Sequence, residues 1–226
     1  MSLRNKTIIV TGANGALGRA VAKEAIALGA IVHALDIAFV GFDLENANLK
    51  KHEVNLLDAN SASACIKNIG KVDALCNVAG GFTMGHAVFE TQQDEFKQMY
   101  DINVQTMLNC IYQVVPQMTA QAYGSIVNVG AKSALGGAAL QGAYIAAKST
   151  VLRLTECMAD ELKINGIRVN AVLPTIIDTP ANRAAMPNAD STLWVQPTQL
   201  AKIILFLASD DSNGINGALL PVRGLL

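Results

Sequence analysis

The feature that most constrains the fold is a regular alternation between short apolar runs and longer helical patterns. The runs are rich in β-branched residues and read, in chain order, TIIVTG, AIVHALD, KHEVN, DALCNVAG, GSIVNVG, IRVNAVLP and GALLPV. Helical patterns are predicted at about 16–28, 61–69, 92–121, 143–165 and 197–209. Apolar strands separated by helices indicate a parallel sheet covered on both faces. We expect an α/β fold, a Rossmann-like doubly wound parallel sheet of about seven strands with helices on both faces.

The chain has enough apolar residues for one core and shows no sign of a second. Its 226 residues are 51% hydrophobic, and no repeat or linker divides them, so residues 1–226 are expected to form one domain. A net charge of −1 favours neither a nucleic-acid nor an anionic-membrane partner. Residues 102–131 carry no charge, but repeated Asn and Gln argue against a membrane span and indicate a buried or subunit-facing helix.

The polar and reactive residues favour a cytoplasmic protein without a metal. The chain enters its first strand almost at once, with neither an apolar signal region nor a basic leader. Three scattered histidines lack metal-binding spacing. No CxxC motif occurs, and all four cysteines lie in segments that look buried, which favours reduced core thiols: Cys65, Cys76, Cys110 and Cys157.

Two segments lack a clear pattern and are expected to be irregular. Residues 37–52 begin apolar and turn polar, whereas 174–196 contain three prolines, one arginine and the only tryptophan. Ligands of doubly wound sheets bind beyond the carboxyl ends of the strands. Because residues 174–196 follow a predicted strand, we expect them to form a loop that covers the substrate.

A glycine-rich turn joins the first strand to the first helix in TIIVTGANGALGRAVAKEAIALGA. Gly12 permits a tight turn, Gly15 keeps side chains away from a phosphate, and Gly18 lets the helix pack on the strand. The helix would then present unpaired N–H groups and its positive end to a pyrophosphate. Glycine turns after strands are common, so this pattern alone leaves an ordinary turn open.

Asp36, at the end of the second strand, supports a dinucleotide site. An acidic residue there can bond the adenosine ribose hydroxyls, and its charge opposes a 2′-phosphate. No Arg or Lys at 37–42 reverses that preference, so NAD(H) is favoured, and NADP(H) stays possible. The alternative is a strand-end aspartate that caps a turn.

Tyr144 and Lys148 are four residues apart in a predicted helix and therefore share one face. A nearby ammonium stabilises a phenolate, so we expect Lys148 to lower the pKa of Tyr144 and make it a usable acid or base. The alternative is a half-exposed Tyr/Lys pair on an ordinary helix.

These motifs together resemble the short-chain dehydrogenase/reductase family over essentially the whole chain. Thr11, Gly12 and Gly18 match its glycine motif, although Ala16 replaces the usual middle glycine. NVAG (77–80) is similar to its strand-four motif, and Tyr144 with Lys148 matches its YxxxK. VLPTIIDTP (172–180) is similar to its nicotinamide segment.

The resemblance implies a site and an assembly. Lys148 would also bond the nicotinamide ribose, and Asn103, in YDINV, would hold a water that links Lys148 to solvent, so Tyr144, Lys148 and Asn103 are the predicted catalytic residues. A helix-mediated homodimer or homotetramer acting on a small-molecule substrate is expected. The predicted cofactor-binding residues are Gly12, Asn14, Gly15, Ala16, Leu17, Gly18, Asp36, Asn55, Leu56, Asn77, Ala79, Gly80, Tyr144, Lys148, Pro174, Thr175, Ile177 and Thr179.

Ala131 departs from the family pattern. A catalytic serine usually stands thirteen positions before the tyrosine, and that position is Ala131 here. The dihydropteridine reductases, a branch that resembles this chain in GAKSALGG and VLPTIIDTPANRAAMPNADSTLW, also lack the serine. The resemblance implies NADH-dependent reduction, with quinonoid dihydropterin as a candidate substrate. The alternatives are a ketone reductase or alcohol dehydrogenase that uses Ser133 or water, and a non-catalytic nucleotide sensor.

Overall fold

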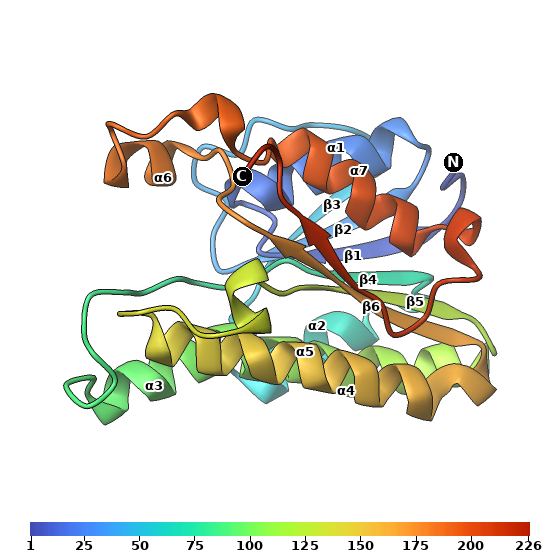
Figure 1. Cartoon of the computed structure of the whole chain (residues 1–226). Coiled ribbons are helices and arrows are strands. Elements are labelled where there is room, and N and C mark those ends of the chain that lie inside the picture. The colour runs from blue at the N-terminus through green and yellow to red at the C-terminus, as the bar shows by residue number, and fades with distance from the viewer.

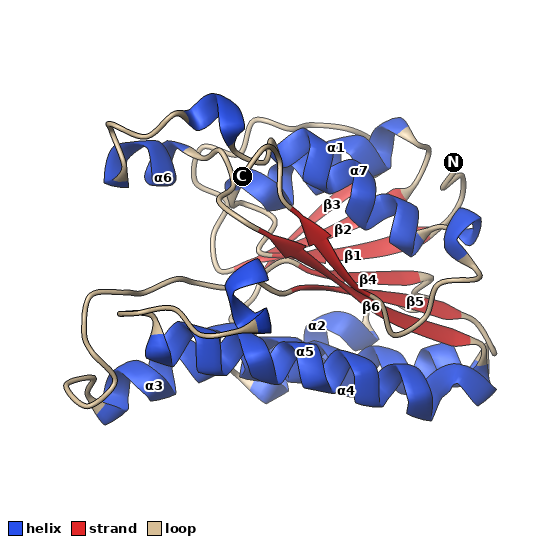
Figure 2. Cartoon of the chain, viewed as in Figure 1, coloured by secondary structure: helices blue, strands red, loops and turns tan.

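The computed structural model describes residues 1–226 and contains one parallel sheet. Its strands are β1 Thr7–Thr11, β2 Ile31–Asp36, β3 Leu49–Glu53, β4 Ala74–Asn77, β5 Gly124–Val129, β6 Ile167–Pro174 and β7 Leu219–Val222. They lie in the order β3-β2-β1-β4-β5-β6-β7 (Figure 2), which confirms the predicted Rossmann-like fold. The chain order reverses between β1 and β4, the position at which doubly wound sheets bind their ligands.

Helices cover both faces of this sheet. They are α1 Ala16–Ala27, α2 Ala59–Lys67, α3 Gln93–Tyr100, α4 Thr106–Ala120, α5 Gly142–Leu162, α6 Pro180–Ala185 and α7 Pro197–Ala208. α1 and α7 lie on one face, and α2, α4 and α5 lie on the other (Figure 1). Each face buries its own cluster of 23 apolar residues, which explains why the central strands are apolar on both sides.

The prediction of a single helix over 92–121 is wrong, because a π-helical turn, Asp101–Gln105, separates α3 from α4. Asn103 lies in this turn, and its Nδ2 donates to the Met99 carbonyl at 3.0 Å. Thr106 Oγ1 likewise donates to the Ile102 carbonyl at 2.8 Å. Both side chains compete with the backbone ladder of the helix, and π turns often occur at functional sites.

The segment 174–196 is more ordered than the irregular loop predicted for it. It contains α6 and a 3₁₀ turn, Ser191–Leu193, and α6 stands out from the body of the molecule (Figure 1). Thr179 caps α6, and Pro180 occupies its first turn, which together form a helix start signal. Asp178 accepts hydrogen bonds from Arg183 and from Gln196, the latter at 2.9 Å, and these bonds fix the base of the segment.

The segment 37–52 also differs from the prediction. β3 begins at Leu49, inside the range expected to be irregular. The apolar residues before it include an aromatic pair, Phe39 and Phe42, whose rings meet edge to face with centroids 5.1 Å apart. This local packing gives the segment a defined course on its way to the edge strand.

The cysteine prediction is wrong for one residue. Cys76 and Cys110 are buried, and burial raises the pKa of both thiols to about 12. Cys65 is half-buried, whereas Cys157 is exposed on α5, and all four are free thiols. No group of three His, Cys, Asp or Glu side chains is arranged to hold a metal ion. None of the helices combines the length and apolarity that crossing a bilayer demands.

Candidate active site

The glycine turn sits where β1 meets β4, and close backbone contacts shape it. Gly12 has φ +61°, and a Cβ on it would lie 2.7 Å from the Ala79 Cα. A Cβ on Gly18 would lie 2.1 Å from the Gly12 carbonyl oxygen, so the start of α1 can approach the turn only with glycine there. Thr11 Oγ1 accepts from the backbone N–H groups of Val78 and Ala79, both at 3.0 Å. These contacts join the turn to the end of β4.

The start of α1 fits a dinucleotide phosphate. No side chain caps the helix after Gly15, and its first turn holds no acidic residue. The first N–H groups of a helix lack partners within the helix, and its positive end attracts anions. The turn therefore leaves N–H groups that could donate to a diphosphate, and cofactor binding by Gly15, Ala16, Leu17 and Gly18 stays a prediction.

Asp36 lies beside this turn, at the end of β2. Its Oδ2 accepts from the Asn14 N–H at 2.8 Å, and its Oδ1 accepts from the Ile37 N–H at 2.7 Å. The carboxylate thus caps the turn, as in the alternative interpretation, while each oxygen keeps a lone pair for a ribose hydroxyl. Ile37 is 72% exposed next to it and offers apolar surface that the sequence analysis did not single out.

Lys148 is buried on the sheet side of α5. It is 5% exposed, and its Nζ donates to the Val129 carbonyl at 2.8 Å. Burial lowers the pKa of Lys148 to about 8, and no carboxylate offsets that effect. A buried ammonium with one carbonyl partner is costly for the fold, which is typical of a residue kept for function.

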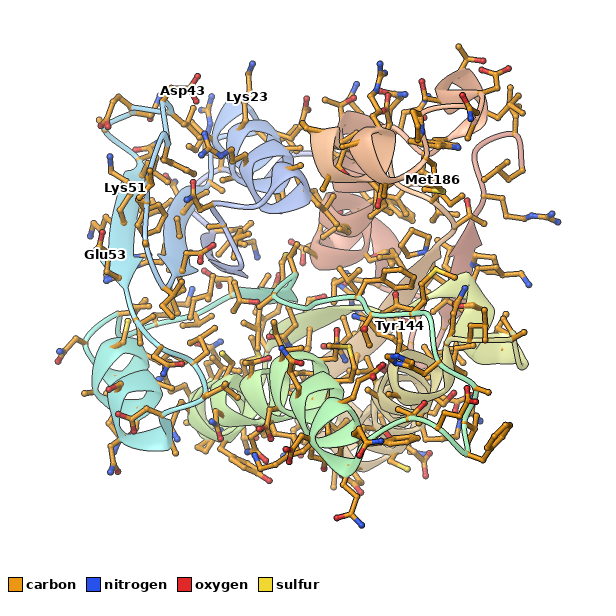
Figure 3. All side chains as sticks on the ribbon, turned by 90° about the vertical axis from the view of Figure 1, so that its left-hand side faces the viewer. Lys23, Asp43, Lys51, Glu53, Tyr144 and Met186 are labelled. Atoms are coloured by element: carbon orange, nitrogen blue, oxygen red, sulfur yellow. The ribbon has the colours of Figure 1, made fainter.

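Tyr144 does not have the lowered pKa that we expected. Burial among apolar groups raises the pKa of Tyr144 to about 12. The Lys148 ammonium donates to the Val129 carbonyl. The Phe82 ring meets the Tyr144 ring nearly perpendicularly, with centroids 4.8 Å apart. Seen from the side of Figure 3, Tyr144 lies between the two helical layers. Phe82 was not predicted as a site residue.

Asn103 and Lys148 meet at Gly80. A Cβ on Gly80 would lie 2.7 Å from Asn103 Oδ1 and 3.2 Å from Lys148 Nζ, so only glycine leaves room for both. Asn103 Oδ1 accepts from the Gly81 N–H, and its Nδ2 donates to the Gly81 carbonyl, both at 3.1 Å. The π turn therefore places the predicted Asn103 next to the predicted Lys148.

Ala131 is buried beside Tyr144, in one small apolar cluster. The position of the expected serine therefore carries the Ala131 methyl group, which belongs to the apolar cluster against which Tyr144 packs. Ser133 lies two residues further on, half-buried in the 3₁₀ turn Lys132–Leu135. The structure gives Tyr144 no adjacent hydroxyl from position 131.

The remaining predicted residues have structural partners. Leu56 is buried, and its carbonyl accepts from Asn109, while Asn55 Oδ1 accepts from the Leu57 N–H at 3.0 Å. Buried Asn77 donates to Asn128 at 2.9 Å. Four predicted residues run from the end of β6 to the start of α6. Pro174 ends β6, Thr175 Oγ1 donates to the Arg223 carbonyl, and Thr179 caps α6. Ile177 pairs with Val195 as an isolated bridge.

Comparison with known proteins identifies the family. Residues 6–190 match the family described as short chain dehydrogenase. The chain is 31% identical to "Short chain dehydrogenase adrF" of Penicillium rubens, over 97% of this chain and 96% of that protein. It is also 31% identical to meso-2,3-butanediol dehydrogenase of Serratia marcescens, over 99% and 95%. The solved structure "ElxO with NADP Bound" is similar, with a TM-score of 0.91 at 26% identity over 97% and 98% of the two chains.

The chain therefore belongs to the short-chain dehydrogenase family and is an oxidoreductase of the NAD(P)-dependent kind. The Serratia relative is named for a diol rather than a pterin, and one similar structure holds NADP.

Proposed function

We propose that this protein is an NADH-dependent reductase in which Tyr144 supplies the proton. Buried Lys148, held beside Asn103 without an acidic partner, is the observation that carries the proposal. The amides at the start of α1 would hold the diphosphate, Asp36 the adenosine ribose and Lys148 the nicotinamide ribose. When bound, the nicotinamide supplies the hydride.

Tyr144 and Lys148 suit a proton relay. At neutral pH the phenol is protonated, since burial raises the pKa of Tyr144 to about 12, so it can donate to a substrate atom that becomes negative. The Lys148 ammonium, with its pKa lowered to about 8, loses a proton more readily than an exposed lysine. It can therefore restore the phenol, and Asn103 would hold the water through which Lys148 regains its proton.

Quinonoid dihydropterin is the substrate that we propose. Reduction of a ketone places charge on one oxygen, where a second hydroxyl donor helps, and loss of one such donor costs about 3–4 kcal/mol. The pterin ring spreads charge over several nitrogens, so Tyr144 can suffice, and Ala131 provides no hydroxyl. The Phe82 ring against Tyr144 adds an aromatic surface that suits a flat ring.

A ketone reductase or alcohol dehydrogenase is the second candidate. The similarity to meso-2,3-butanediol dehydrogenase favours it, and Ser133 in the 3₁₀ turn would then supply the displaced hydroxyl. The two candidates differ in which side chain the reaction needs besides Tyr144.

Steady-state kcat/KM on quinonoid dihydropterin and on a panel of ketones separates these candidates. We expect the wild type to reduce the pterin well and ketones poorly. Ala131→Ser should improve ketone reduction more than pterin reduction, and Ser133→Ala is the matched control that should change neither by more than about twofold. Strong ketone reduction by the wild type that collapses in Ser133→Ala would make the second candidate correct.

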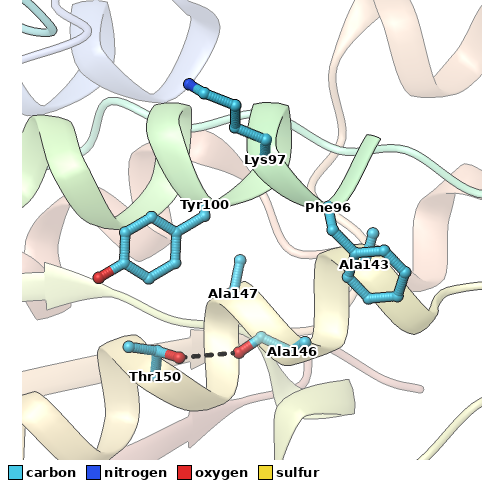
Figure 4. Close-up of a pocket in the computed structure, with 7 residues that line it drawn as sticks. All are labelled: Phe96, Lys97, Tyr100, Ala143, Ala146, Ala147 and Thr150. Carbon is cyan, nitrogen blue, oxygen red and sulfur yellow. Dashed lines mark hydrogen bonds between the residues drawn. The ribbon is translucent and has the colours of Figure 1, made fainter. Parts of the chain in front are cut away.

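We further propose that the protein acts in the cytoplasm as a homodimer or homotetramer joined through α4 and α5. Tyr112 on α4 is 60% exposed. A hollow of about 370 Å³ between α3 and α5 can admit a partner side chain (Figure 4); it is lined by Phe96, Lys97, Tyr100, Ala143, Ala146, Ala147 and Thr150. No predicted site residue lines this hollow. Light scattering of the wild type and Tyr112→Lys tests the interface, because the lysine should shift the protein towards the monomer.

A further inference from the structure

One arginine ties the loop of residues 37–43 to the glycine turn. Arg19 follows Gly18 at the start of α1, and its guanidinium reaches both segments. Nε donates to the Asn14 carbonyl at 2.9 Å, and Nη2 donates to Asn14 Oδ1 at 2.5 Å and to the Val40 carbonyl at 3.2 Å. Nη1 donates to the Gly41 carbonyl at 2.5 Å. The side chain thus bonds the turn and the loop at the same time.

Packing beneath the guanidinium strengthens this tie. The Arg19 Cζ lies 5.0 Å from the centroid of the buried Phe42 ring, which in turn contacts Phe39. The ion pair with Asp43 contributes little, because that carboxylate is 95% exposed and 3.4 Å away. The bonds to carbonyl oxygens and the aromatic contact therefore fix the loop, rather than the surface ion pair.

The same turn residue connects Arg19 to Asp36. Asn14 accepts from Arg19 through its carbonyl and its Oδ1, and its own N–H donates to Asp36 Oδ2 at 2.8 Å. The loop begins at Ile37, whose N–H donates to the other Asp36 oxygen. Movement of the loop or of Asn14 would thus turn the carboxylate that is proposed to meet the adenosine ribose.

We propose that Arg19 is a positioning residue that makes the adenosine end of the site select NADH over NADPH. Apart from the long contact with the exposed Asp43 carboxylate, its donors are directed at the uncharged oxygens of Asn14, Val40 and Gly41. The guanidinium would therefore release the loop if it turned to a 2′-phosphate. Held in place, the loop keeps the Asp36 carboxylate at the ribose, where its charge opposes that phosphate. This inference rests on the proposed placement of the ribose at Asp36.

Direct binding of the two nucleotides tests the inference. Dissociation constants for NADH and NADPH would be measured by nucleotide fluorescence for the wild type, Arg19→Gln and Arg19→Lys, with exposed Arg4→Gln as the matched control. Arg19→Gln should weaken NADH about tenfold, because the binding-competent loop becomes a minority conformation, and NADPH less than about threefold. The dissociation constants of Arg19→Lys should fall between those of the wild type and Arg19→Gln. In Arg19→Gln, amide hydrogen exchange should quicken at residues 37–43, while the amides of β1 and β5 keep their protection.

Each other outcome has a definite meaning. Greater weakening of NADPH than of NADH would overturn the inference and make Arg19 a phosphate ligand, and unchanged constants would leave it no role. Asp36→Ala distinguishes a failure of the proposed ribose site from a failure of the Arg19 inference. If Asp36→Ala does not weaken NADH binding, the placement of the ribose at Asp36 is wrong. If Asp36→Ala weakens NADH binding but Arg19→Gln does not, only the role of Arg19 is refuted. If Arg19→Gln does not fold, Phe42→Leu loosens the loop from below and must reduce the NADH preference in the same direction.

Discussion

Replacing Lys148 by methionine should stabilise the cofactor-free protein at neutral pH while removing its activity. Burial lowers the pKa of Lys148 from 10.5 to about 8, and each pH unit corresponds to about 1.4 kcal/mol. Holding the charged form in the folded state therefore costs about 3 kcal/mol at pH 7. Methionine fills a similar volume but leaves the Val129 carbonyl without its donor, at about 1 kcal/mol. The net gain should be about 2 kcal/mol in the free energy of unfolding.

The stability difference between Lys148→Met and the wild type should depend on pH, because the pKa of Lys148 differs between the folded and unfolded states. Between pH 8 and 10.5 the unfolded lysine binds more protons than the folded one, so the stability of the wild type rises across that window. The advantage of Lys148→Met should be full below pH 8 and shrink as the pH approaches 10.5. Urea unfolding at one fixed protein concentration, at pH 7 and near pH 10, measures the difference. A variant less stable than the wild type at pH 7, or an advantage that does not change with pH, would refute the reasoning.

Three further predictions concern the groups around the site. Gly80→Ala should lower kcat by at least about tenfold with nearly unchanged far-UV circular dichroism, since its Cβ would meet Asn103 Oδ1 at 2.7 Å; wild-type kcat would contradict the crowding argument. In the cofactor-free protein Tyr144 should not ionise by about pH 10, so ultraviolet absorbance titrations of wild type and Tyr144→Phe should agree up to there; an additional tyrosinate in the wild type would contradict the burial effect. Thr155→Val should destabilise by about 1–3 kcal/mol in urea unfolding, because it leaves the buried Asn128 amide without an acceptor; no change would mean that water replaces the hydroxyl.

The fold could be predicted because its causes are local and repeated. Strands buried on both faces must be apolar, and the intervening helices must be amphipathic, so the alternation alone leads to the observed sheet. Gly12 and Gly18 were predictable for the same reason, since the close contacts that need glycine are made within one strand, turn and helix or with the adjacent β4.

The parts that escaped prediction depend on contacts between distant segments or on a single side chain. The π turn arises where Asn103 and Thr106 bond carbonyls of the preceding turn, and both residues look ordinary in a helix. The pKa of Tyr144 is set by its burial in the folded chain, which the spacing to Lys148 does not reveal. The Val129 carbonyl that accepts from Lys148 likewise carries no sequence signal. Arg19 reads as a surface residue of an amphipathic helix until the loop at 37–43 is placed beside it.

The most direct test of the account is single-turnover oxidation of bound NADH by Tyr144→Phe with its best substrate. Phenylalanine keeps the ring that contacts Phe82 and removes only the proton donor. We expect NADH binding within about twofold of the wild type and a rate of hydride transfer lower by about 10² to 10⁴. A variant that oxidises NADH at the wild-type rate would contradict the assignment of Tyr144 as the acid, and with it the proposed reaction.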